Sequence, residues 1–285
     1  MQPTSLVWKM LEFYGTRIKH RGKNRVHEWL RSALRAEANC DLEVERRYLR
    51  WQLNPSDFVQ THLYWTGEYE PWDLQELSRW VAPNAVFLDV GANFGYYSVC
   101  LAPLMKGSGQ VFAFEPCHPT LERLKINIAL NHLESIIKPV PCGLSDQPGS
   151  AYLDETDWNS GAATISVQSK GAKIMLDTLD NFCESQKLDR LDLIKIDVEG
   201  SEFRVLQGGQ STIARFQPVL MIEFNSSALK NSGSSVKQLD AILRGWGYQL
   251  YTRTRKSLHP FQPDQDDLPV VNVFCFPPRC WPIRT

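Results

Sequence analysis

Residues 86–95 read VFLDVGANFG, an apolar run that ends in two glycines, Gly91 and Gly95. The apolar half predicts a buried β-strand, and the residues after Gly95 predict a helix. Glycines at a strand-to-helix turn let the backbone approach a ligand closely and let the helix pack tightly on the strand. Because open parallel sheets bind ligands at this carboxyl end, the stretch predicts a Rossmann-like fold with its site here.

Around this stretch, apolar strands alternate with amphipathic helices from Ala85 onward. That alternation is typical of an α/β fold, in which helices cover both faces of a mostly parallel sheet. An irregular insert after Asp146 predicts two or three short strands. We predict main-sheet strands at residues 86–91, 110–116, 137–146, 191–200, 218–225, 248–255 and 270–276. The predicted domains are an N-terminal helical and hairpin cap over residues 1–70 and the sheet domain over residues 71–285.

The N-terminal segment is helical by its pattern and strongly basic. Residues 1–35 carry eight Lys or Arg against Glu12 and Glu28. A basic helix can lie on an anionic membrane surface, but a solvated helix face is the simpler interpretation and the one we favour. The turn residues Asn54 to Asp57 predict a hairpin. The candidate core contacts of this segment are Trp8, Leu11, Ile18, Trp29, Leu30 and Leu34.

Composition limits the possible partners. The formal net charge of −1 over 285 residues argues against nucleic acid and favours a small-molecule substrate. Seven scattered cysteines without a C-x-x-C pair indicate reduced thiols. No apolar run is long enough to span a membrane, and the N-terminus lacks a signal-peptide core, so we expect a cytoplasmic protein. A homodimer is compatible with these features.

The spacing of the motif distinguishes two cofactor classes. A dinucleotide fingerprint has three glycines, and Asp89 occupies the first of those positions. A carboxylate there would repel a pyrophosphate, but it suits the ammonium group of S-adenosylmethionine. Glu115 ends the second strand, where an acid can accept hydrogen bonds from ribose hydroxyls, and the end of the third strand can meet an adenine edge. The predicted cofactor-binding residues are Asp89, Gly91, Asn93, Gly95, Glu115, Pro116, Gly143, Ser145, Asp146 and Asp197.

Several segments in order, FLDVGANFGYYS, AFEPCHPTLERLKINIALN, CGLSD, DTLD, LIKIDVEGSEFRVLQGG and MIEFN, resemble the FkbM family of S-adenosylmethionine-dependent methyltransferases over about residues 66–226. The resemblance implies a class I methyltransferase fold, with a seven-stranded sheet whose last strand is antiparallel. It also implies, most often, O-methylation of a hydroxyl group on a sugar or natural product. Residues 1–60 and the C-terminal tail lie outside the clear match.

An alcohol acceptor needs its proton removed by a positioned base or acidified by a metal. In LIKIDVEG, residues 193–200, the period of two puts Lys195 and Asp197 on one face near the strand's carboxyl end. Glu223 and Asn225 end the next strand. The arrangement is similar to that of catechol-type O-methyltransferases, which hold magnesium with such oxygens. A magnesium site formed by Asp197, Glu223 and Asn225 and a metal-free base at Asp197 both stay open.

Three charged residues of this region, Lys195, Glu199 and Glu202, divide between possible catalytic and structural roles. Lys195 is a candidate base if burial depresses its pKa, but a buried cation paired with a nearby acid is the interpretation we favour. Glu202 follows Ser201, and we expect this pair to cap a helix. Glu199, on the connecting loop, can face the pocket. The candidate catalytic residues are Asp197, Lys195 and Glu223, and the candidate substrate contacts are Glu70, Trp158, Asn159, Glu199 and Asn225.

Other functions remain as alternatives. N-methylation of a small-molecule amine uses the same fold and needs less help with the proton. The sequence Asp197-Val198-Glu199-Gly200 lacks the polar residue, two prolines and aromatic that are common in nucleic-acid and protein-amine methyltransferases. An NAD-dependent oxidoreductase is disfavoured by Asp89. A binding module without activity is disfavoured because the motif residues are intact.

Overall fold

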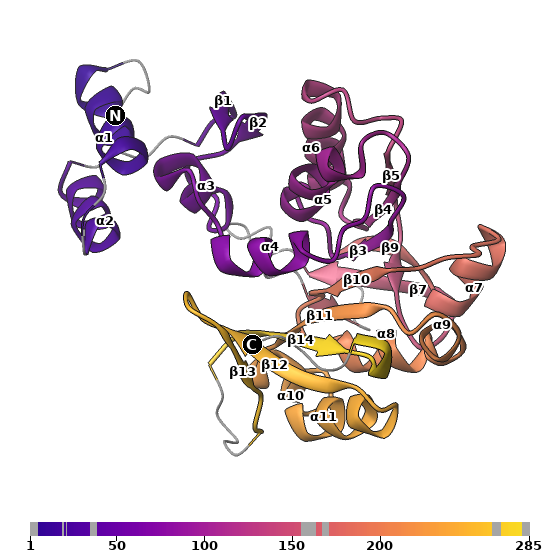
Figure 1. The fold of residues 1–285 in the computed structure, drawn as a ribbon. Helices are drawn as coiled ribbons and strands as arrows, with labels where there is room; N and C mark the ends of the chain where they lie inside the picture. Colours follow the sequence, from indigo (N-terminus) through magenta and orange to yellow (C-terminus); the bar gives the residue numbers. More distant parts are fainter. Residues whose placement is uncertain are drawn as a thin grey trace. The chain divides into compact units, whose positions relative to one another are not determined.

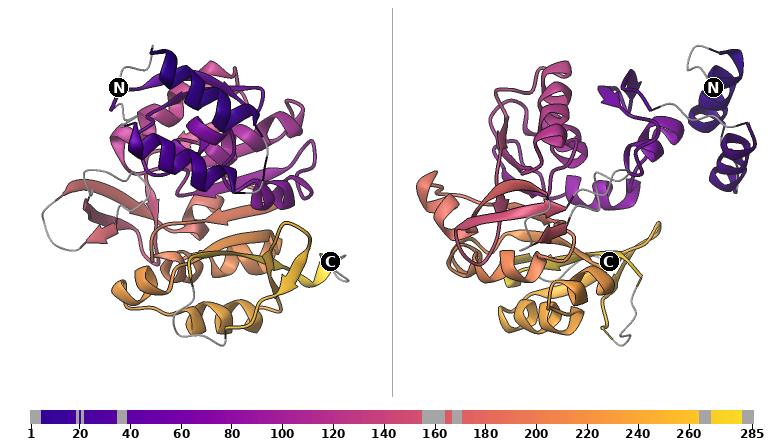
Figure 2. Two further views of the ribbon diagram at one scale, coloured as in Figure 1. Left: turned by 90° about the vertical axis from the view of Figure 1, so that its left-hand side faces the viewer. Right: turned by 180° about the vertical axis from the view of Figure 1, so that it is seen from behind.

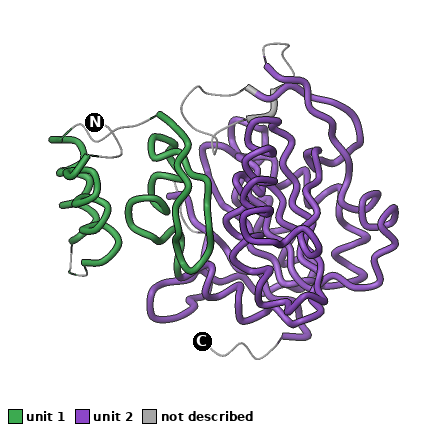
Figure 3. The backbone as a smooth tube through the Cα atoms, turned by 90° about the horizontal axis from the view of Figure 1, so that it is seen from above, with its two compact units in different colours: residues 1–71, 156–161 green, residues 72–155, 162–285 purple. Residues whose placement is uncertain are grey.

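The computed structural model describes residues 5–18, 20, 22–34, 39–154, 164–166, 171–263 and 269–280. The chain divides into two compact units (Figure 3). One comprises residues 1–71 and 156–161, and the other comprises residues 72–155 and 162–285. The glycine motif and the strands around it lie in the second unit.

An eight-stranded sheet organises the second unit, in the order β13-β12-β14-β11-β10-β3-β4-β5 (Figure 1). The five strands from β5 to β11 are parallel, and β14 pairs antiparallel with both β11 and β12. Along the chain these strands are β3 (Val86–Val90), β4 (Gln110–Phe114), β5 (Ile137–Val140), β10 (Leu193–Ile196), β11 (Val219–Phe224), β12 (Gln249–Arg253), β13 (Leu258–Pro260) and β14 (Val271–Phe276). The expected Rossmann-like α/β fold is therefore present.

The expected seven-stranded sheet is wrong in one detail, because an eighth strand is present. Between the last two predicted strands, β13 folds back on β12 as an antiparallel hairpin. Leu258 anchors it with 4% of its surface exposed. β13 and β5 are thus the two edge strands of the sheet.

The predicted strand over residues 137–146 is divided between two sheets. β5 ends at Val140, and β6 (Gly143–Leu144) pairs with β9 (Ala172–Asp177) in a separate four-stranded sheet. Pro141 lies between them and has no backbone N–H to continue a ladder. The other two strands are β7 (Gly149–Asp154) and β8 (Thr164–Ser166), so the insert forms short strands as predicted.

Helices cover both faces of the large sheet (Figures 1 and 2). One face carries α4 (Pro71–Ser78), α5 (Tyr96–Leu101), the 3-10 helix η1 (Ala102–Met105) and α6 (His118–Leu130). The other carries α7 (Leu179–Ser185), α8 (Glu202–Gln207), α9 (Gln210–Phe216), α10 (Ser226–Asn231) and α11 (Val236–Gly245). A second 3-10 helix, η2 (Pro278–Cys280), follows β14.

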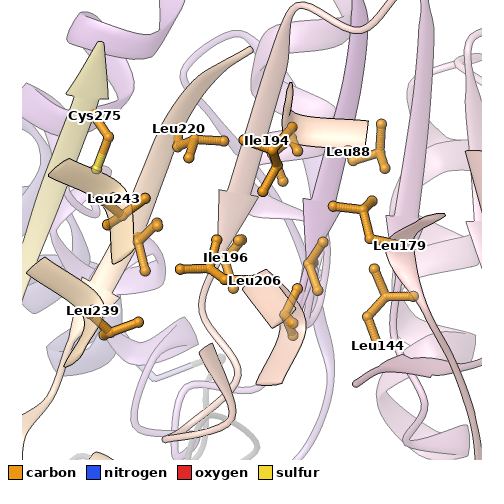
Figure 4. Packing of buried hydrophobic residues seen from close by; sticks show 14 of the residues in the cluster. Leu88, Leu144, Leu179, Ile194, Ile196, Leu206, Leu220, Leu239, Leu243 and Cys275 are labelled. Atoms are coloured by element: carbon orange, nitrogen blue, oxygen red, sulfur yellow. The ribbon is translucent and has the colours of Figure 1, made fainter. Parts of the chain in front are cut away.

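A large hydrophobic cluster fills the space between the sheet and the second helix layer. Figure 4 shows Leu88, Ile194 and Leu220 of adjacent strands together with Leu206 and Leu243 of the helices. Because strand residues alternate between faces, Asp89 and Lys195 point to the opposite face, toward α5. The alternation thus keeps these two charged residues out of the cluster of Figure 4, on a face that they share with the buried Phe87 and Met221.

The first unit contains α1 (Leu6–Arg17), α2 (Lys23–Ala33), β1 (Leu42–Arg46), β2 (Leu49–Leu53) and α3 (Gln60–Thr66). β1 and β2 form a hairpin whose turn is Arg47-Tyr48, with φ of 56° and 63°. The hairpin predicted at Asn54 to Asp57 is wrong. Asp57 instead accepts hydrogen bonds from the backbone N–H groups of Val59 and Gln60, which is the way a polar side chain begins a helix.

The core contacts predicted in the N-terminal segment are only partly correct. Trp8 and Leu11 are buried, but Ile18, Leu34 and Trp29 are 39%, 41% and 67% exposed. Helical periodicity groups residues on a face but does not say which face a neighbour covers. Within the described part of the chain, no helix is both long enough and apolar enough to cross a bilayer.

Candidate active site

The register of the central strands brings the predicted catalytic residues together. Lys195 on β10 lies opposite Asp89 on β3, and Ile196 lies opposite both Val90 and Ile222. One residue further, Asp197 therefore follows β10 beside Glu223 of β11. The sheet itself, more than any loop, sets the spacing of these side chains.

The Lys195 ammonium contacts oxygen atoms of three residues at the carboxyl ends of β3 and β10. It donates a hydrogen bond to the carbonyl oxygen of Gly91 at 2.8 Å, and it lies 3.1 Å from Asp197 Oδ2 and 3.7 Å from Asp89 Oδ1. It also lies 5.6 Å from the centre of the Tyr97 ring. Lys195 is only 4% exposed, so these contacts replace the water that a buried cation loses.

Asp89 is completely buried beneath the glycine loop. The backbone N–H and the hydroxyl of Ser98 donate to its Oδ2 at 3.1 and 2.6 Å. Its Oδ1 accepts no hydrogen bond from the described residues and faces Lys195. Burial raises the pKa of Asp89, whereas Lys195 and Ser98 lower it. In this structure the cation that faces Asp89 is therefore the side chain of Lys195.

Two residues of this network, Tyr97 and Ser98, were not identified from the sequence. Both lie in the first turn of α5, and Ser98 is a buried polar residue in the otherwise apolar run YYSVCL. A buried hydroxyl needs a hydrogen-bond partner, and the nearest acid of the preceding motif is Asp89. The isolated serine in this run was the available signal.

The loop between β3 and α5 has a backbone that excludes most side chains. Gly91 has φ of 78°, and a Cβ placed there would lie 1.9 Å from the carbonyl oxygen of Asp197. Gly95 has φ of 94°, and its Cβ would lie 2.5 Å from Leu124. Asn93, with φ of 51°, tolerates this region, and its side chain accepts a hydrogen bond from the N–H of Phe94. The glycines thus allow the loop to lie directly against the end of β10.

Glu115, at the end of β4, is held by this loop. Its two oxygens accept hydrogen bonds from the backbone N–H groups of Asn93 and Cys117, each at 2.9 Å. Burial raises the pKa of Glu115 to about 7, against the opposing effect of those two bonds. A carboxylate oxygen has a second lone pair, so each can still accept a hydroxyl.

The remaining predicted cofactor residues lie on and beside the smaller sheet. Gly143 and Pro116 are neighbours, because a Cβ on Gly143 would lie 3.8 Å from the Pro116 ring. Ser145 is buried and donates its hydroxyl to Asp146 at 2.9 Å, whereas Asp146 is exposed. Gly143 belongs to β6, and Ser145 and Asp146 follow it, so β5 of the main sheet ends before these three residues.

Three carboxylates converge at the ends of β10 and β11. One oxygen of each of Asp197, Glu199 and Glu223 lies within 4.8 Å of the others. Burial and the nearby Asp197 charge raise the pKa of Glu199 to about 8 and hold that of Glu223 well above its usual range. Three such oxygens are a donor set that a divalent cation accepts. Asn272, the β14 partner of Glu223 in the sheet, is a polar neighbour that the sequence did not indicate.

Asn225 and Glu202 have structural contacts. Asn225 caps α10, with its side-chain oxygen accepting from the N–H of Ala228 at 3.1 Å. The capping predicted for Ser201 is wrong, because its side chain makes no cap hydrogen bond. Glu202 does not cap α8 either, because its Oε1 accepts from the N–H groups of Val198 and Gly200, which lie in the loop before the helix.

Of the other predicted substrate contacts, Glu199 belongs to the carboxylate group. Glu70 lies in the first unit, in a left-handed conformation with φ of 39°. Trp158 and Asn159 lie outside the described residues.

Several known proteins are similar in sequence to parts of this chain. "Methyltransferase sdnD" from Sordaria araneosa is 26% identical over 63% of this chain and 79% of its own. "Hexuronic acid methyltransferase AglP" from Haloferax volcanii is 30% identical over 43% of this chain and 49% of its own. "2-O-methyltransferase NoeI" from Sinorhizobium fredii is 28% identical over 47% of this chain and 60% of its own. The matches thus cover about half of the two proteins whose names specify a chemistry.

A family model extends over the site just described. The model for the methyltransferase FkbM domain matches residues 89–250, which is more than half of the chain. The match begins at Asp89 and includes Glu115, Lys195, Asp197 and Glu223. This chain therefore belongs to the FkbM family of methyltransferases.

Proposed function

We propose that this protein transfers a methyl group from S-adenosylmethionine to a hydroxyl group of a sugar or other small natural product. The observation that carries the proposal is that the Gly91 loop and the Asp197 carboxylate meet at one edge of the sheet. The loop would bind the cofactor, and the carboxylate would accept the proton of the acceptor hydroxyl. The names of two relatives, a hexuronic acid methyltransferase and a 2-O-methyltransferase, support the choice of acceptor.

The cofactor would be held by the loop and by Glu115. The Glu115 oxygens, fixed by two backbone N–H groups, would accept hydrogen bonds from the ribose hydroxyls. Asp89, at 0% exposure, is placed too deeply to touch a ligand in this conformation. We assign it a positioning role, in which it holds the start of α5 through Ser98 and orients Lys195.

S-adenosylmethionine supplies an electrophilic methyl group on a sulfonium. The acceptor oxygen forms a bond to the methyl carbon, the carbon–sulfur bond breaks, and sulfur keeps the electron pair as a neutral thioether. The hydroxyl proton must pass to a base, and we assign it to Asp197. The raised pKa values of Glu199 and Glu223 favour the protonated form of these two acids near neutral pH, and Asp197 is the acid of the three that pairs with Lys195, at 3.1 Å.

Magnesium is a second way to activate the hydroxyl at the same place. Asp197, Glu199 and Glu223 would hold the ion in place of the predicted set with Asn225, whose side chain caps a helix. A bound divalent cation would acidify the hydroxyl and displace the protons of the two glutamic acids. These three carboxylates fit the ligand preference of magnesium. Methyl transfer with Asp197 as the base does not require the ion.

Two measurements test the function. Titration calorimetry should show binding of S-adenosylmethionine and none of NADH. Incubation with methyl-labelled S-adenosylmethionine and an extract of small molecules should then label a product that carries an O-methyl group, with and without EDTA. A product labelled on nitrogen, or binding of NADH in place of the sulfonium cofactor, would contradict the proposal.

Asp197→Asn should lower methyl transfer at least about a hundredfold while leaving cofactor affinity within a few-fold. Asp192→Asn is the matched control, because Asp192 precedes the same strand and also pairs with a cation, Arg190 at 2.6 Å. The control should keep its activity. Equal losses in both variants would show that the effect is structural.

A further inference from the structure

The N-terminal helix α1 is apolar on two opposite sides, and the described residues cover one of them. On the covered side, Trp8 donates its indole N–H to the Tyr64 hydroxyl at 2.8 Å and packs on Trp65, with ring centres 4.5 Å apart. Leu11 is buried on the same side. The packing of α1 onto α3 is therefore satisfied without the rest of the helix.

The uncovered side carries a stripe of large apolar residues. Leu6, Met10 and Phe13 are 74%, 62% and 60% exposed. Their spacing of four and three residues places them above one another on one helix face, opposite the buried Trp8 and Leu11. On α2, Val26 and Trp29 are three residues apart and 42% and 67% exposed.

Basic side chains accompany these stripes. Residues 1–35 contain eight Lys or Arg and two Glu, and Lys9, Arg17 and Arg25 are exposed on the two helices. Glu12, one of the two acids, is already paired with Arg46 at 2.6 Å. The surface thus combines exposed Leu, Met, Phe and Trp with an excess of positive charge.

We propose that α1 and α2 bind the surface of an anionic lipid bilayer, with Leu6, Met10, Phe13 and Trp29 inserted among the acyl chains and the basic residues at the headgroups. Helices that lie in a membrane interface have this composition. At 12 residues, α1 is about 18 Å long, too short to span a bilayer and suited to lie on it.

The charge distinguishes this occupant from a second copy of the chain. A two-fold dimer through these stripes would place the same surface on both sides, so two basic segments would face each other and repel. An anionic bilayer would instead attract the basic segment. A fully solvated face, favoured from the sequence alone, would not carry four large apolar side chains at 60% exposure or more.

Vesicle flotation of the full chain tests the proposal, with phosphatidylcholine vesicles compared with vesicles that also contain phosphatidylserine. The wild type should float with the anionic vesicles, bind the neutral ones much more weakly, and be released by high salt. Equal recovery with both vesicle types, or with neither, would overturn the proposal.

Two variants locate the surface. Met10→Ser combined with Phe13→Ser should weaken vesicle binding at least about tenfold. Met175→Ser is the matched control, because Met175 is 61% exposed and lies in the other unit. The control should bind vesicles as the wild type does, and both variants should bind S-adenosylmethionine unchanged.

A charge variant tests the electrostatic part. Lys9→Glu with Arg25→Glu should abolish the preference for anionic vesicles, whereas Lys256→Glu on the second unit should not. Light scattering, which measures the oligomeric state, tests the alternative of a protein interface. If the wild type shows no vesicle binding but forms a dimer that Phe13→Ser dissolves, the stripe is a protein interface and the proposal fails.

Discussion

The ammonium of Lys195 lies 3.7 Å from Asp89 Oδ1, and the two side chains face each other across adjacent strands in a site that excludes water. The same ammonium holds Asp197 and the Gly91 carbonyl oxygen. One cation therefore fixes the relative positions of the loop, the buried acid and the candidate base. Substitutions can separate the positioning role of Lys195 from proton removal by Asp197.

Lys195→Met should destabilise the protein by about 3–5 kcal/mol, because removing one partner of a buried ion pair leaves the carboxylates without a counter-charge. Cofactor affinity should fall as well, since the Gly91 carbonyl oxygen loses its donor. Urea unfolding and calorimetry measure the two effects. Lys125→Met, which removes a half-exposed pair with Glu122, should change neither. A Lys195→Met protein of wild-type stability would contradict this reading of the network.

Gly91→Ala should abolish detectable binding of S-adenosylmethionine, because its Cβ would collide with the Asp197 carbonyl oxygen. Gly107→Ala is the control. Gly107 has nearly the same backbone conformation, with φ of 82° against 78°, but no atom lies within 4 Å of its Cβ position. Backbone strain alone should affect both variants equally, so the difference in cofactor affinity reports the close approach at Gly91.

Glu202→Gln should flatten the dependence of stability on pH. Burial raises the pKa of Glu202 from 4.5 to about 7, so the folded protein holds this proton more tightly than the unfolded chain does. The resulting stabilisation is complete below pH 4.5 and is lost as the pH rises to about 7. Between these limits the wild type should lose up to roughly 3 kcal/mol relative to the variant.

Unfolding by urea at pH 4.5 and pH 8 measures the effect. Glu184→Gln, on an exposed residue, is the control and should follow the wild type. Parallel curves for the wild type and Glu202→Gln would show that this proton is not bound more tightly by the fold.

Glu223→Gln should retain most of the methyl transfer at pH 7 if Asp197 is the base, because the amide resembles the protonated acid that burial favours there. Labelled-methyl assays across pH provide the measurement. A loss as deep as that of Asp197→Asn would move the base to Glu223. If EDTA also inhibits the wild type, the same loss would indicate a bound cation.

The sequence predicted those parts of the molecule in which local pattern and chemistry agree. The strand and glycines around Asp89 predicted the parallel sheet, and six segments in order predicted the family. Chemistry that depends on register was less accessible. The sequence allowed Lys195 to be a base or a paired cation, and only the strand register places Asp89 opposite it. In the same way, Glu202 binds N–H groups of the loop before its helix, where the sequence predicted a cap.

The errors in the first unit have the same origin. Arg47-Tyr48 forms the hairpin turn although neither is a typical turn residue, whereas Asn54 to Asp57, with typical turn chemistry, leads into a helix. Trp29 has the spacing of a core residue, but it is 67% exposed among the described residues. In each case tertiary contacts decided between local structures that the sequence allows equally.

The two edge strands of the large sheet have a consequence for association. β5 contains Pro139 and β13 ends in Pro260, so each edge has a position without a backbone N–H to donate. An incoming strand would find an interrupted ladder on either side, which discourages strand-by-strand polymerisation into aggregates. The prolines of the two edge strands therefore oppose growth of the sheet from one molecule to the next at high concentration. A homodimer would be expected to form through a surface other than these edge strands.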